Sequence, residues 1–258
     1  MRILILGGTI EAFELAGRLS GDARFAPIFS LAGRTAKPIL PPIAHRIGGF
    51  GGASGLADWL RAESIDAIVD ATHPFAARIS ANAAIAARQV GVPILFLQRP
   101  PWRQEDGDNW TRVADMVHAA AALGEPPARV FLAIGRQEVA AFKGAPQHFY
   151  LVRAIEPPAA DDLPPRCEVV LQRGPFELAA EREMLAAHVI NVVVSKNAGG
   201  EAAYAKIAAA RQLGLPVVMV ERVPLPDGDT VASVDEALRW LVSVLAARHG
   251  SSASERGV

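Results

Sequence analysis

The segment Gly7-Gly8-Thr9-Ile10-Glu11 carries residue types that bind phosphate groups. It lies between an apolar run at residues 3–6, which predicts a buried strand, and a periodic stretch at residues 11–19, which predicts a helix. Glycines at such a turn let the backbone approach a pyrophosphate, and the helix N-terminus favours its charge. We expect these residues to contact a cofactor, with the Thr9 hydroxyl donating to a phosphate. Because G-x-G-x-x-G would need glycines at Thr9 and Ala12, a turn without a ligand is the alternative.

A predicted second strand, residues 26–31, leads into Gly33-Arg34-Thr35. Enzymes that use NAD hold the adenosine ribose with Asp or Glu at the end of this strand. This chain has no carboxylate there, and the Arg34 guanidinium suits the 2′-phosphate of NADP. The segment therefore predicts NADPH as the cofactor, with a solvated surface arginine as the alternative. The glycine-rich segment at residues 48–52 predicts either a mobile flap near the cofactor or a plain loop.

The segment Asp70-Ala71-Thr72-His73-Pro74-Phe75 follows a predicted strand at residues 67–70 and leads into a predicted helix at residues 76–90. Doubly wound sheets bind their ligands at the carboxyl ends of their strands. His73 is the candidate for proton transfer, because the unperturbed pKa of an imidazole lies near neutrality. The alternative is that His73 caps the loop or bonds a cofactor amide. We assign Thr72 and Pro74, which is expected near the first turn of the helix, to the cofactor and Phe75 to the substrate.

Three cationic residues in the second half follow predicted strands. Arg136 follows residues 129–133, Arg173 follows residues 168–172, and Lys196 with Asn197 follows residues 189–194. Because the carboxyl ends of parallel strands share one edge of a sheet, these groups should gather there. Such a group suits an anionic ligand with several carboxylates, so these residues are the candidate substrate-binding set. The alternative is a series of separate helix caps with solvated charges, with Pro175 opening one of the helices.

The elements that must position these residues alternate between strands and helices, which predicts parallel βαβ units. Further strands are expected at residues 93–97, 149–152 and 217–220, and further helices at residues 56–62, 137–142, 177–187, 201–212 and 234–247. The segment starting at Gly91 resembles the one starting at Gly214, because each closes a helix and enters a strand. We therefore predict an α/β protein with two similar Rossmann-like doubly wound domains, residues 1–110 and 111–248, and a flexible tail at residues 249–258.

The composition excludes several classes of protein. The net charge of −1, from 26 basic and 27 acidic residues, argues against a nucleic-acid partner. We find no apolar run of membrane-spanning length and no signal peptide at the start of the sequence. The single Cys167 can form neither an internal disulfide nor a cysteine-based metal site, and we predict no bound metal. A cytoplasmic location is the resulting expectation.

The motifs GGTIEA, GGFGG, DATHPFA, AIGR, GPF and SKNAGG occur in this order. Together they resemble the precorrin-6A reductase family of cobalamin biosynthesis, from Ile3 to about Arg222. Ala198 departs from the small hydroxyl residue expected in the family. The resemblance implies an NADPH-dependent enzyme that reduces one double bond of a tetrapyrrole, converting precorrin-6A to precorrin-6B. It also implies two Rossmann-like domains with a cleft between them, and a substrate whose carboxylate arms would meet the cationic residues of the second half.

Two other interpretations remain at this stage. A reductase of a small carbonyl compound would be expected to carry a Tyr-x-x-x-Lys pair, but neither Tyr150 nor Tyr204 has Lys four residues later. A non-catalytic NADP-binding regulator would need the cationic residues of the second half to be structural only. The sequence does not decide between a metal-free and a cobalt-containing substrate.

Overall fold

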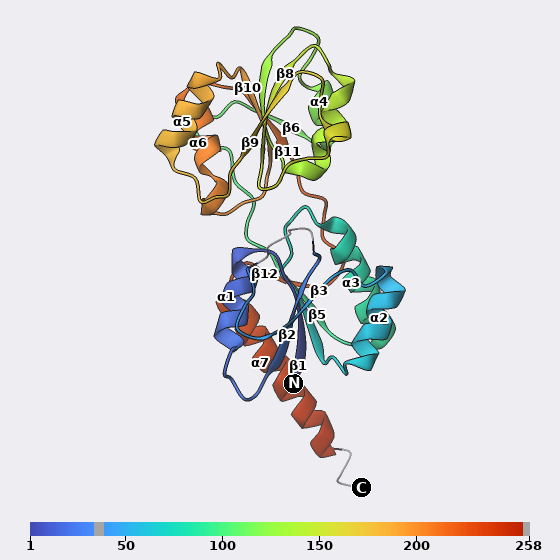
Figure 1. The fold of residues 1–258 in the computed structure, drawn as a ribbon. Coiled ribbons are helices and arrows are strands. Elements are labelled where there is room, and N and C mark those ends of the chain that lie inside the picture. The colour runs from blue at the N-terminus through green and yellow to red at the C-terminus, as the bar shows by residue number, and fades with distance from the viewer. Residues whose placement is uncertain (34–38, 255–258) are drawn as a thin grey trace. The chain divides into compact units, whose positions relative to one another are not determined.

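The computed structural model describes residues 1–33 and 39–254. The chain divides into two compact units (Figure 1). The first contains Met1–Arg99 and the chain from Pro224 onward, and the second contains Pro100–Val223. Each unit is a parallel sheet covered by helices, which confirms the predicted α/β class with two similar doubly wound domains.

The sheet of the first unit has the strand order β12-β5-β4-β1-β2-β3, and all its neighbouring strands are parallel. Its strands are β1 (Arg2–Leu6), β2 (Ala26–Leu31), β3 (Ala44–Ile47), β4 (Ala67–Asp70), β5 (Ile94–Leu97) and β12 (Asp229–Val231). From β1 the chain adds β2 and β3 on one side of the sheet, and then β4, β5 and β12 on the other side. The strand order therefore reverses between β1 and β4. Ligands of doubly wound sheets bind at such a point, outside the carboxyl ends of the strands.

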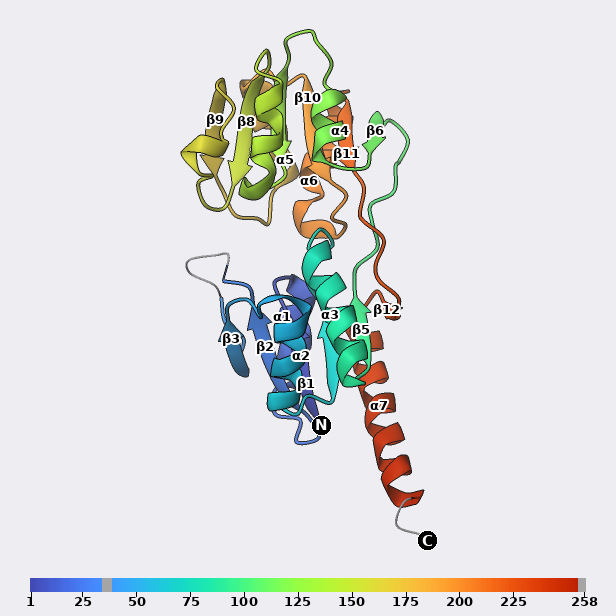
Figure 2. The ribbon, with the colours of Figure 1, turned by 90° about the vertical axis from the view of Figure 1, so that its right-hand side faces the viewer.

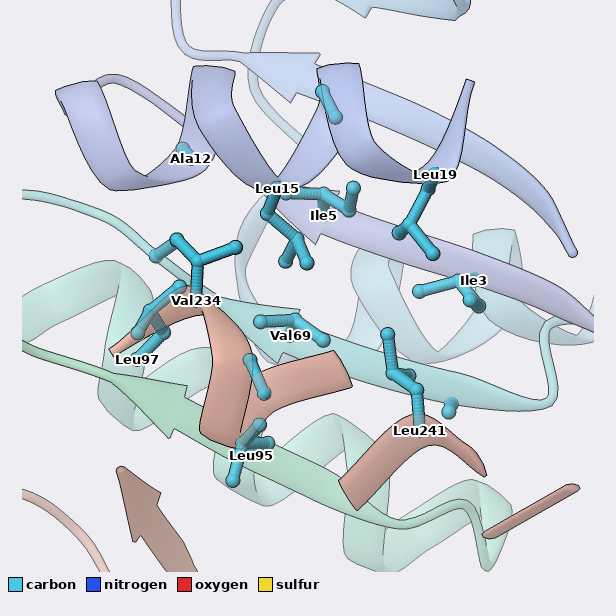
Figure 3. Packing of buried hydrophobic residues seen from close by; sticks show 14 of the residues in the cluster. Ile3, Ile5, Ala12, Leu15, Leu19, Val69, Leu95, Leu97, Val234 and Leu241 are labelled. Atoms are coloured by element: carbon cyan, nitrogen blue, oxygen red, sulfur yellow. The ribbon is translucent and has the colours of Figure 1, made fainter. Parts of the chain in front are cut away.

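Helices cover both faces of this first sheet (Figure 2). Their bounds are α1 (Ile10–Leu19), α2 (Gly52–Ala62), α3 (Ala77–Val90) and α7 (Val234–Ser254). The apolar faces of α1 and α7 pack against alternate strand residues, with Leu15, Val69 and Leu241 fully buried (Figure 3). Helices α2 and α3 bury a second cluster on the opposite face, around Leu4 and Leu56. The strands are therefore buried on both faces, as their continuous apolar runs predict.

The second unit repeats this arrangement with the strand order β6-β11-β10-β7-β8-β9, again fully parallel. Its strands are β6 (Trp110–Val113), β7 (Arg129–Ala133), β8 (Phe149–Ala154), β9 (Cys167–Leu171), β10 (Val192–Lys196) and β11 (Val217–Val220). Its α-helices are α4 (Met116–Ala121), α5 (Leu178–Ala187) and α6 (Ala205–Gln212). Short 3₁₀ helices occur at η1 (Arg136–Gly144), η2 (Ala160–Asp162) and η3 (Glu201–Ala203).

The predicted domain boundaries are wrong at the C-terminal end. Strand β12 pairs with β5 of the first unit, and Val234 and Leu241 of α7 belong to the first unit's core. Residues 111–248 therefore do not form one domain. Helix α7 also continues to Ser254, so residues 249–254 are helical rather than a tail, and residues 255–258 lie outside the described part of the chain.

Several local predictions also need correction. Helix α3 begins at Ala77, after a turn that contains Pro74, and α5 begins at Leu178, after a cis peptide bond between Gly174 and Pro175. Neither proline therefore opens its helix. The helix expected at residues 137–142 is a 3₁₀ helix, and the one expected at residues 201–212 is divided into η3 and α6. Within the described residues, no helix is both long and apolar enough to cross a membrane.

Candidate functional site

The turn after β1 combines tight packing with open space. The Gly7 N–H donates to the Ser30 carbonyl oxygen at 2.9 Å, and a Cβ at Gly7 would lie 2.2 Å from the Phe29 ring. Gly8 has a φ of +131°, and apart from Gly8 and its chain neighbours no heavy atom of the described residues lies within 4 Å of the position a Cβ would take. Packing therefore requires a glycine at position 7, whereas Gly8 leaves room at the start of α1. The first N–H groups of a helix have no intrahelical partner, so this room suits a phosphate.

Thr9 caps α1 and joins it to the neighbouring strand end. Its hydroxyl oxygen accepts the Ala12 N–H at 3.2 Å, and the hydroxyl donates to the Ala71 carbonyl oxygen at 2.8 Å. A threonine hydroxyl has one hydrogen, which Ala71 receives here. In this structure the hydroxyl hydrogen of Thr9 is used within the protein, so its donation to a phosphate stays a prediction that would require this bond to change. Its role is to hold the glycine turn against the segment that follows β4.

The two residues after Thr9 differ in exposure and in charge partners. Ile10 is 64% exposed. The carboxylate of Glu11 pairs with Arg99, at 2.9 Å and 3.1 Å from the guanidinium nitrogen to the two oxygens. Arg99 follows β5, so this ion pair links the start of α1 to another strand end of the same unit. It also offsets the negative charge of Glu11 at the point where a phosphate would bind.

Strand β3, which pairs with β2, carries a basic residue that the sequence did not single out. Arg46 on β3 lies opposite Ser30 in the parallel pair, and its guanidinium donates to the Ser30 hydroxyl at 2.9 Å. It also donates to the carbonyl oxygens of Gly48 and Gly49, each at 3.0 Å, and lies 3.8 Å from the centre of the Phe50 ring. Arg46 thus ties the glycine-rich segment to the end of β2. The sequence did not predict β3, because its four residues are too few and too polar to show a strand pattern.

Of the residues predicted to read the adenosine ribose, only Gly33 is described. It has a φ of +73°, which favours glycine, and the Cβ of another residue there would approach Ile47 to 3.2 Å. Arg34 and Thr35 lie outside the described residues. Their assignment to the cofactor therefore stays a prediction.

Asp70 is a buried carboxyl group at the end of β4. It is 4% exposed, and its Oδ1 accepts the Thr72 N–H at 3.0 Å and the Thr72 hydroxyl at 2.7 Å. Burial raises the pKa of Asp70, while hydrogen bonds from Ser80 and Thr72 lower it. Because Thr72 gives its hydroxyl hydrogen to Asp70, the Thr72 oxygen keeps lone pairs to accept another donor.

His73 is exposed, whereas Pro74 beside it is buried. The His73 Nδ1 accepts the Phe75 N–H at 3.2 Å, so the neutral imidazole carries its hydrogen on Nε2. Protonation of Nδ1 would place a hydrogen against that N–H and break this bond. The rings of His73 and Phe75 lie 5.9 Å apart, and Phe75 is half-buried. His73 therefore holds the turn after β4 through its Nδ1.

The second unit brings the predicted cationic residues to one edge of its sheet. Lys196 ends β10 and Arg136 follows β7, and these two strands are neighbours, whereas Arg173 follows β9 at the far end of the sheet. Arg136 pairs with Glu156 at 3.1 Å, and Lys196 pairs with Glu138. Arg173 is exposed. All three residues follow the carboxyl ends of strands of one parallel sheet, but their gathering around one ligand stays a prediction. Carboxylates of the protein already offset part of their positive charge.

Asn197 is used within the protein. It is 1% exposed, and its side chain accepts the Trp102 N–H at 2.8 Å and donates to the Trp102 carbonyl oxygen at 3.2 Å. Ala198, where the resemblance predicted a hydroxyl residue, is also buried. Asn197 therefore anchors the incoming segment that contains Trp102. Its assignment to the substrate stays a prediction and would require one of these bonds to change.

The family model of Precorrin-6x reductase CbiJ/CobK matches residues 2–242 of this chain. The chain belongs to this family. The family resemblance of the sequence motifs is thereby confirmed, and the protein is an oxidoreductase of cobalamin biosynthesis. A reductase of this kind uses a nicotinamide cofactor, and the open glycine turn at the start of α1 fits a dinucleotide.

Individual family members show the same relationship across nearly the whole chain. Precorrin-6A reductase from Sinorhizobium sp is 54% identical over 245 residues, covering 95% of this chain and 94% of its own. The enzyme of that name from Rhodobacter capsulatus is 48% identical and covers 100% of this chain and 99% of its own. A solved structure of CobK precorrin-6A reductase matches with a TM-score of 0.89 and 47% identity, covering 95% of this chain and 97% of that one.

More distant family members carry a different name. Cobalt-precorrin-6A reductase from Salmonella typhimurium is 26% identical over 266 residues, covering 93% of this chain and 97% of its own. The family thus contains proteins named for both the metal-free and the cobalt-containing substrate.

Proposed function

We propose that this protein reduces metal-free precorrin-6A to precorrin-6B, with NADPH as the hydride donor. The observation that carries the proposal is the 54% identity to a precorrin-6A reductase over 95% of this chain. Relatives named for the metal-free substrate are 43–54% identical, whereas those named for the cobalt complex are 26–27% identical. This difference favours the metal-free substrate.

The first unit would bind the cofactor. Gly7, Gly8, Ile10 and Glu11 would surround the pyrophosphate with backbone N–H groups at the start of α1. Arg34, with Gly33 and Thr35, would bind the 2′-phosphate, which supports NADPH over NADH. The ion pair between Glu11 and Arg99 reduces the repulsion that a carboxylate in this turn would exert on a phosphate.

The segment after β4 offers complementary groups for the nicotinamide amide. Thr72 presents an acceptor because its hydrogen points to Asp70, and His73 would supply an Nε2–H donor once the cofactor is bound. A carboxamide has an N–H₂ donor and a carbonyl acceptor, so it could bond to both residues. When bound, NADPH supplies the hydride to one carbon of the reduced double bond.

The second unit would bind the carboxylate arms of the macrocycle. Arg173 is exposed and available to an anionic group, while Arg136 and Lys196 lie in ion pairs with Glu156 and Glu138. A substrate carboxylate would compete with these glutamates for the cations. A cytoplasmic location of the reaction is part of the proposal and is supported by the single cysteine of the chain.

The test is an anaerobic assay of the purified protein with NADPH and metal-free precorrin-6A, with the cobalt complex and NADH as comparisons. We expect oxidation of one NADPH for each tetrapyrrole reduced, and faster turnover of the metal-free compound. NADPH binding without turnover of either tetrapyrrole would contradict the proposal and support a regulator. Faster turnover of the cobalt complex would contradict the assigned substrate.

A further inference from the structure

Three charged side chains lie buried together in the second unit. Arg153 on β8 is 6% exposed, Glu181 on α5 is 2% exposed, and Lys206 on α6 is 4% exposed. Arg153 and Glu181 form an ion pair through Glu181 Oε1, and Glu181 Oε2 has no hydrogen-bond partner among the described residues. Burial of charged groups is costly, so a network of this kind calls for a role beyond filling a core.

Lys206 is the member of this network whose charge can change near neutral pH. Burial, and after it the charge of Arg153, lower the pKa of Lys206, the charge of Glu181 opposes them, and together they bring the pKa to about 7. The Lys206 Nζ donates to the Ala203 carbonyl oxygen at 2.6 Å and lies 4.7 Å from the Trp102 ring. The charged groups that act on it are therefore Arg153 and Glu181, while η3 contributes a carbonyl and the Trp102 segment an uncharged indole.

The network contacts segments that lie next to the candidate substrate residues. The Trp102 indole N–H donates to the Gly200 carbonyl oxygen at 2.9 Å, so Lys206 and Trp102 together hold the turn that follows Lys196. The Arg153 guanidinium lies 3.8 Å from the centre of the Phe176 ring, in the segment that follows Arg173. One buried cluster thus supports both loops.

The charges of the cluster do not balance when Lys206 is protonated. Two cations then face one carboxylate, which leaves an excess positive charge beneath the loops. A carboxylate bound at these loops would favour the protonated form of Lys206. By linkage, protonation of Lys206 would in turn favour binding of the carboxylate.

We propose that Lys206, supported by the Arg153–Glu181 pair, is a positioning residue that holds the loops after β9 and β10, and that its protonation strengthens binding of an anionic substrate. A protonated amine makes the stronger bond to the Ala203 carbonyl and the stronger contact with the Trp102 ring. Lys206 acts through these loops and need not touch the substrate. The substrate part of this proposal rests on the function proposed above.

The first experiment follows tryptophan fluorescence of the full protein against pH, without substrate. We expect a transition with a midpoint near pH 7 in the wild-type protein, because the charge on Lys206 changes beside the Trp102 ring. Trp102→Phe and Lys206→Met should each remove the transition. Glu181→Gln should move it to lower pH, since it removes the carboxylate that favours the charged amine.

Lys143→Met is the matched control. Lys143 belongs to the same unit and also donates to a backbone carbonyl, that of Asp161, but it is exposed. It should leave the transition unchanged. A transition that persists in Lys206→Met, or a wild-type signal that is flat around pH 7, would overturn the proposal. If Lys206→Met does not fold, the expected shift of the transition to lower pH in Glu181→Gln still tests the proposal.

The second experiment measures the KM for precorrin-6A and the Kd for NADPH at several pH values. In the wild-type protein we expect the KM to rise severalfold, and by at most about tenfold per pH unit, above neutral pH. Lys206→Met should raise the KM at low pH and remove most of this dependence, with the NADPH Kd unchanged. The same pH dependence in wild type and Lys206→Met would contradict the proposal.

Arg173→Ala separates this proposal from the function on which it rests. If Arg173→Ala leaves the KM for precorrin-6A unchanged, the assigned substrate edge is wrong, whatever the fluorescence shows. If Arg173→Ala raises the KM but Lys206→Met does not alter its pH dependence, the substrate edge stands and the role of Lys206 is wrong.

Discussion

The hydroxyl of Thr9 at the start of α1 donates a hydrogen bond of 2.8 Å to the carbonyl oxygen of Ala71 at the end of β4. The Thr9 hydroxyl oxygen also accepts the Ala12 N–H of the first helical turn. One buried side chain therefore fixes both the turn that would bind the pyrophosphate and the segment that carries Thr72 and His73. The ends of β1 and β4 lie at the point where the strand order of the sheet reverses.

Thr9→Val should lower the free energy of unfolding by ~1–3 kcal/mol, because the helix cap is lost and the Ala71 carbonyl loses its partner. Thr9→Ser keeps the hydroxyl and should restore most of this loss. Urea unfolding of both variants measures the difference. Equal stability of Thr9→Val and the wild-type protein would show that this hydrogen bond contributes nothing.

Arg34→Ala should weaken NADPH binding by roughly tenfold to a hundredfold, since a charged hydrogen bond contributes ~1.5–3 kcal/mol. NADH binding should change little. Arg24→Ala is the control, because Arg24 is an exposed arginine of the same unit that pairs with Asp22. Fluorescence titration with both cofactors measures the effect. Equal losses for NADPH and NADH would contradict the assignment of Arg34 to the 2′-phosphate.

His73→Ala should lower kcat by about tenfold or less, because His73 holds the loop through its bond to the Phe75 N–H and we propose that it contacts the cofactor without transferring a proton. An essential general acid would cost about 10²–10⁴-fold and would remove a limb of the pH profile. Steady-state kinetics and NADPH titration distinguish these outcomes. A loss beyond about a thousandfold with intact NADPH binding would identify His73 as the acid.

Glu138→Gln should lower the KM for precorrin-6A by a small factor, roughly twofold to fivefold, because it frees Lys196 from a partly exposed ion pair. Lys196→Met should raise the KM, and the effect should shrink as salt screens the charges. In the double variant, Glu138→Gln should have no further effect. If Glu138→Gln lowers the KM equally in the Lys196→Met background, the effect of Glu138 does not depend on its ion pair with Lys196.

The stability of the wild-type protein should rise with pH between about 7 and 10 relative to Lys206→Met. The unfolded chain holds the Lys206 proton up to its ordinary pKa near 10.5, whereas the folded chain releases it near 7. Between these values the unfolded state binds more protons, so raising the pH favours the folded state. Urea midpoints across this interval measure the effect. Parallel pH curves for the two proteins would exclude a lowered pKa.

Much of the candidate site could be predicted from local sequence. The glycine turn after β1, the Asp70–Phe75 segment and the cationic strand ends stand at the expected edges because strand-to-helix turns have strong local signals. The partners of these residues could not be predicted. The bonds from Thr9 to Ala71 and from Asn197 to Trp102 join residues 62 and 95 positions apart, respectively, and depend on how the strands pack.

The domain boundary shows most clearly which features local sequence predicts and which depend on tertiary packing. The segments Val113-Ala114-Asp115 and Val231-Ala232-Ser233 are similar, and each ends a strand and precedes a helix. A simple tandem repeat would place the first in the N-terminal unit and the second in the C-terminal unit. The structure has the opposite assignment, because β6 pairs with β11 and β12 pairs with β5.

The sequence by itself determined the family, the α/β class and the repeated unit, and it predicted candidate residues for binding a dinucleotide and a polycarboxylate. Those features are encoded in local apolar periodicity, turn residues and short motifs. Only the tertiary structure decided which sheet receives β6 and β12, which glutamates neutralise Arg136 and Lys196, and that Lys206 is buried beside Arg153 and Glu181. An edge strand of three or four residues offers similar backbone hydrogen bonds to either sheet, so long-range packing makes that choice.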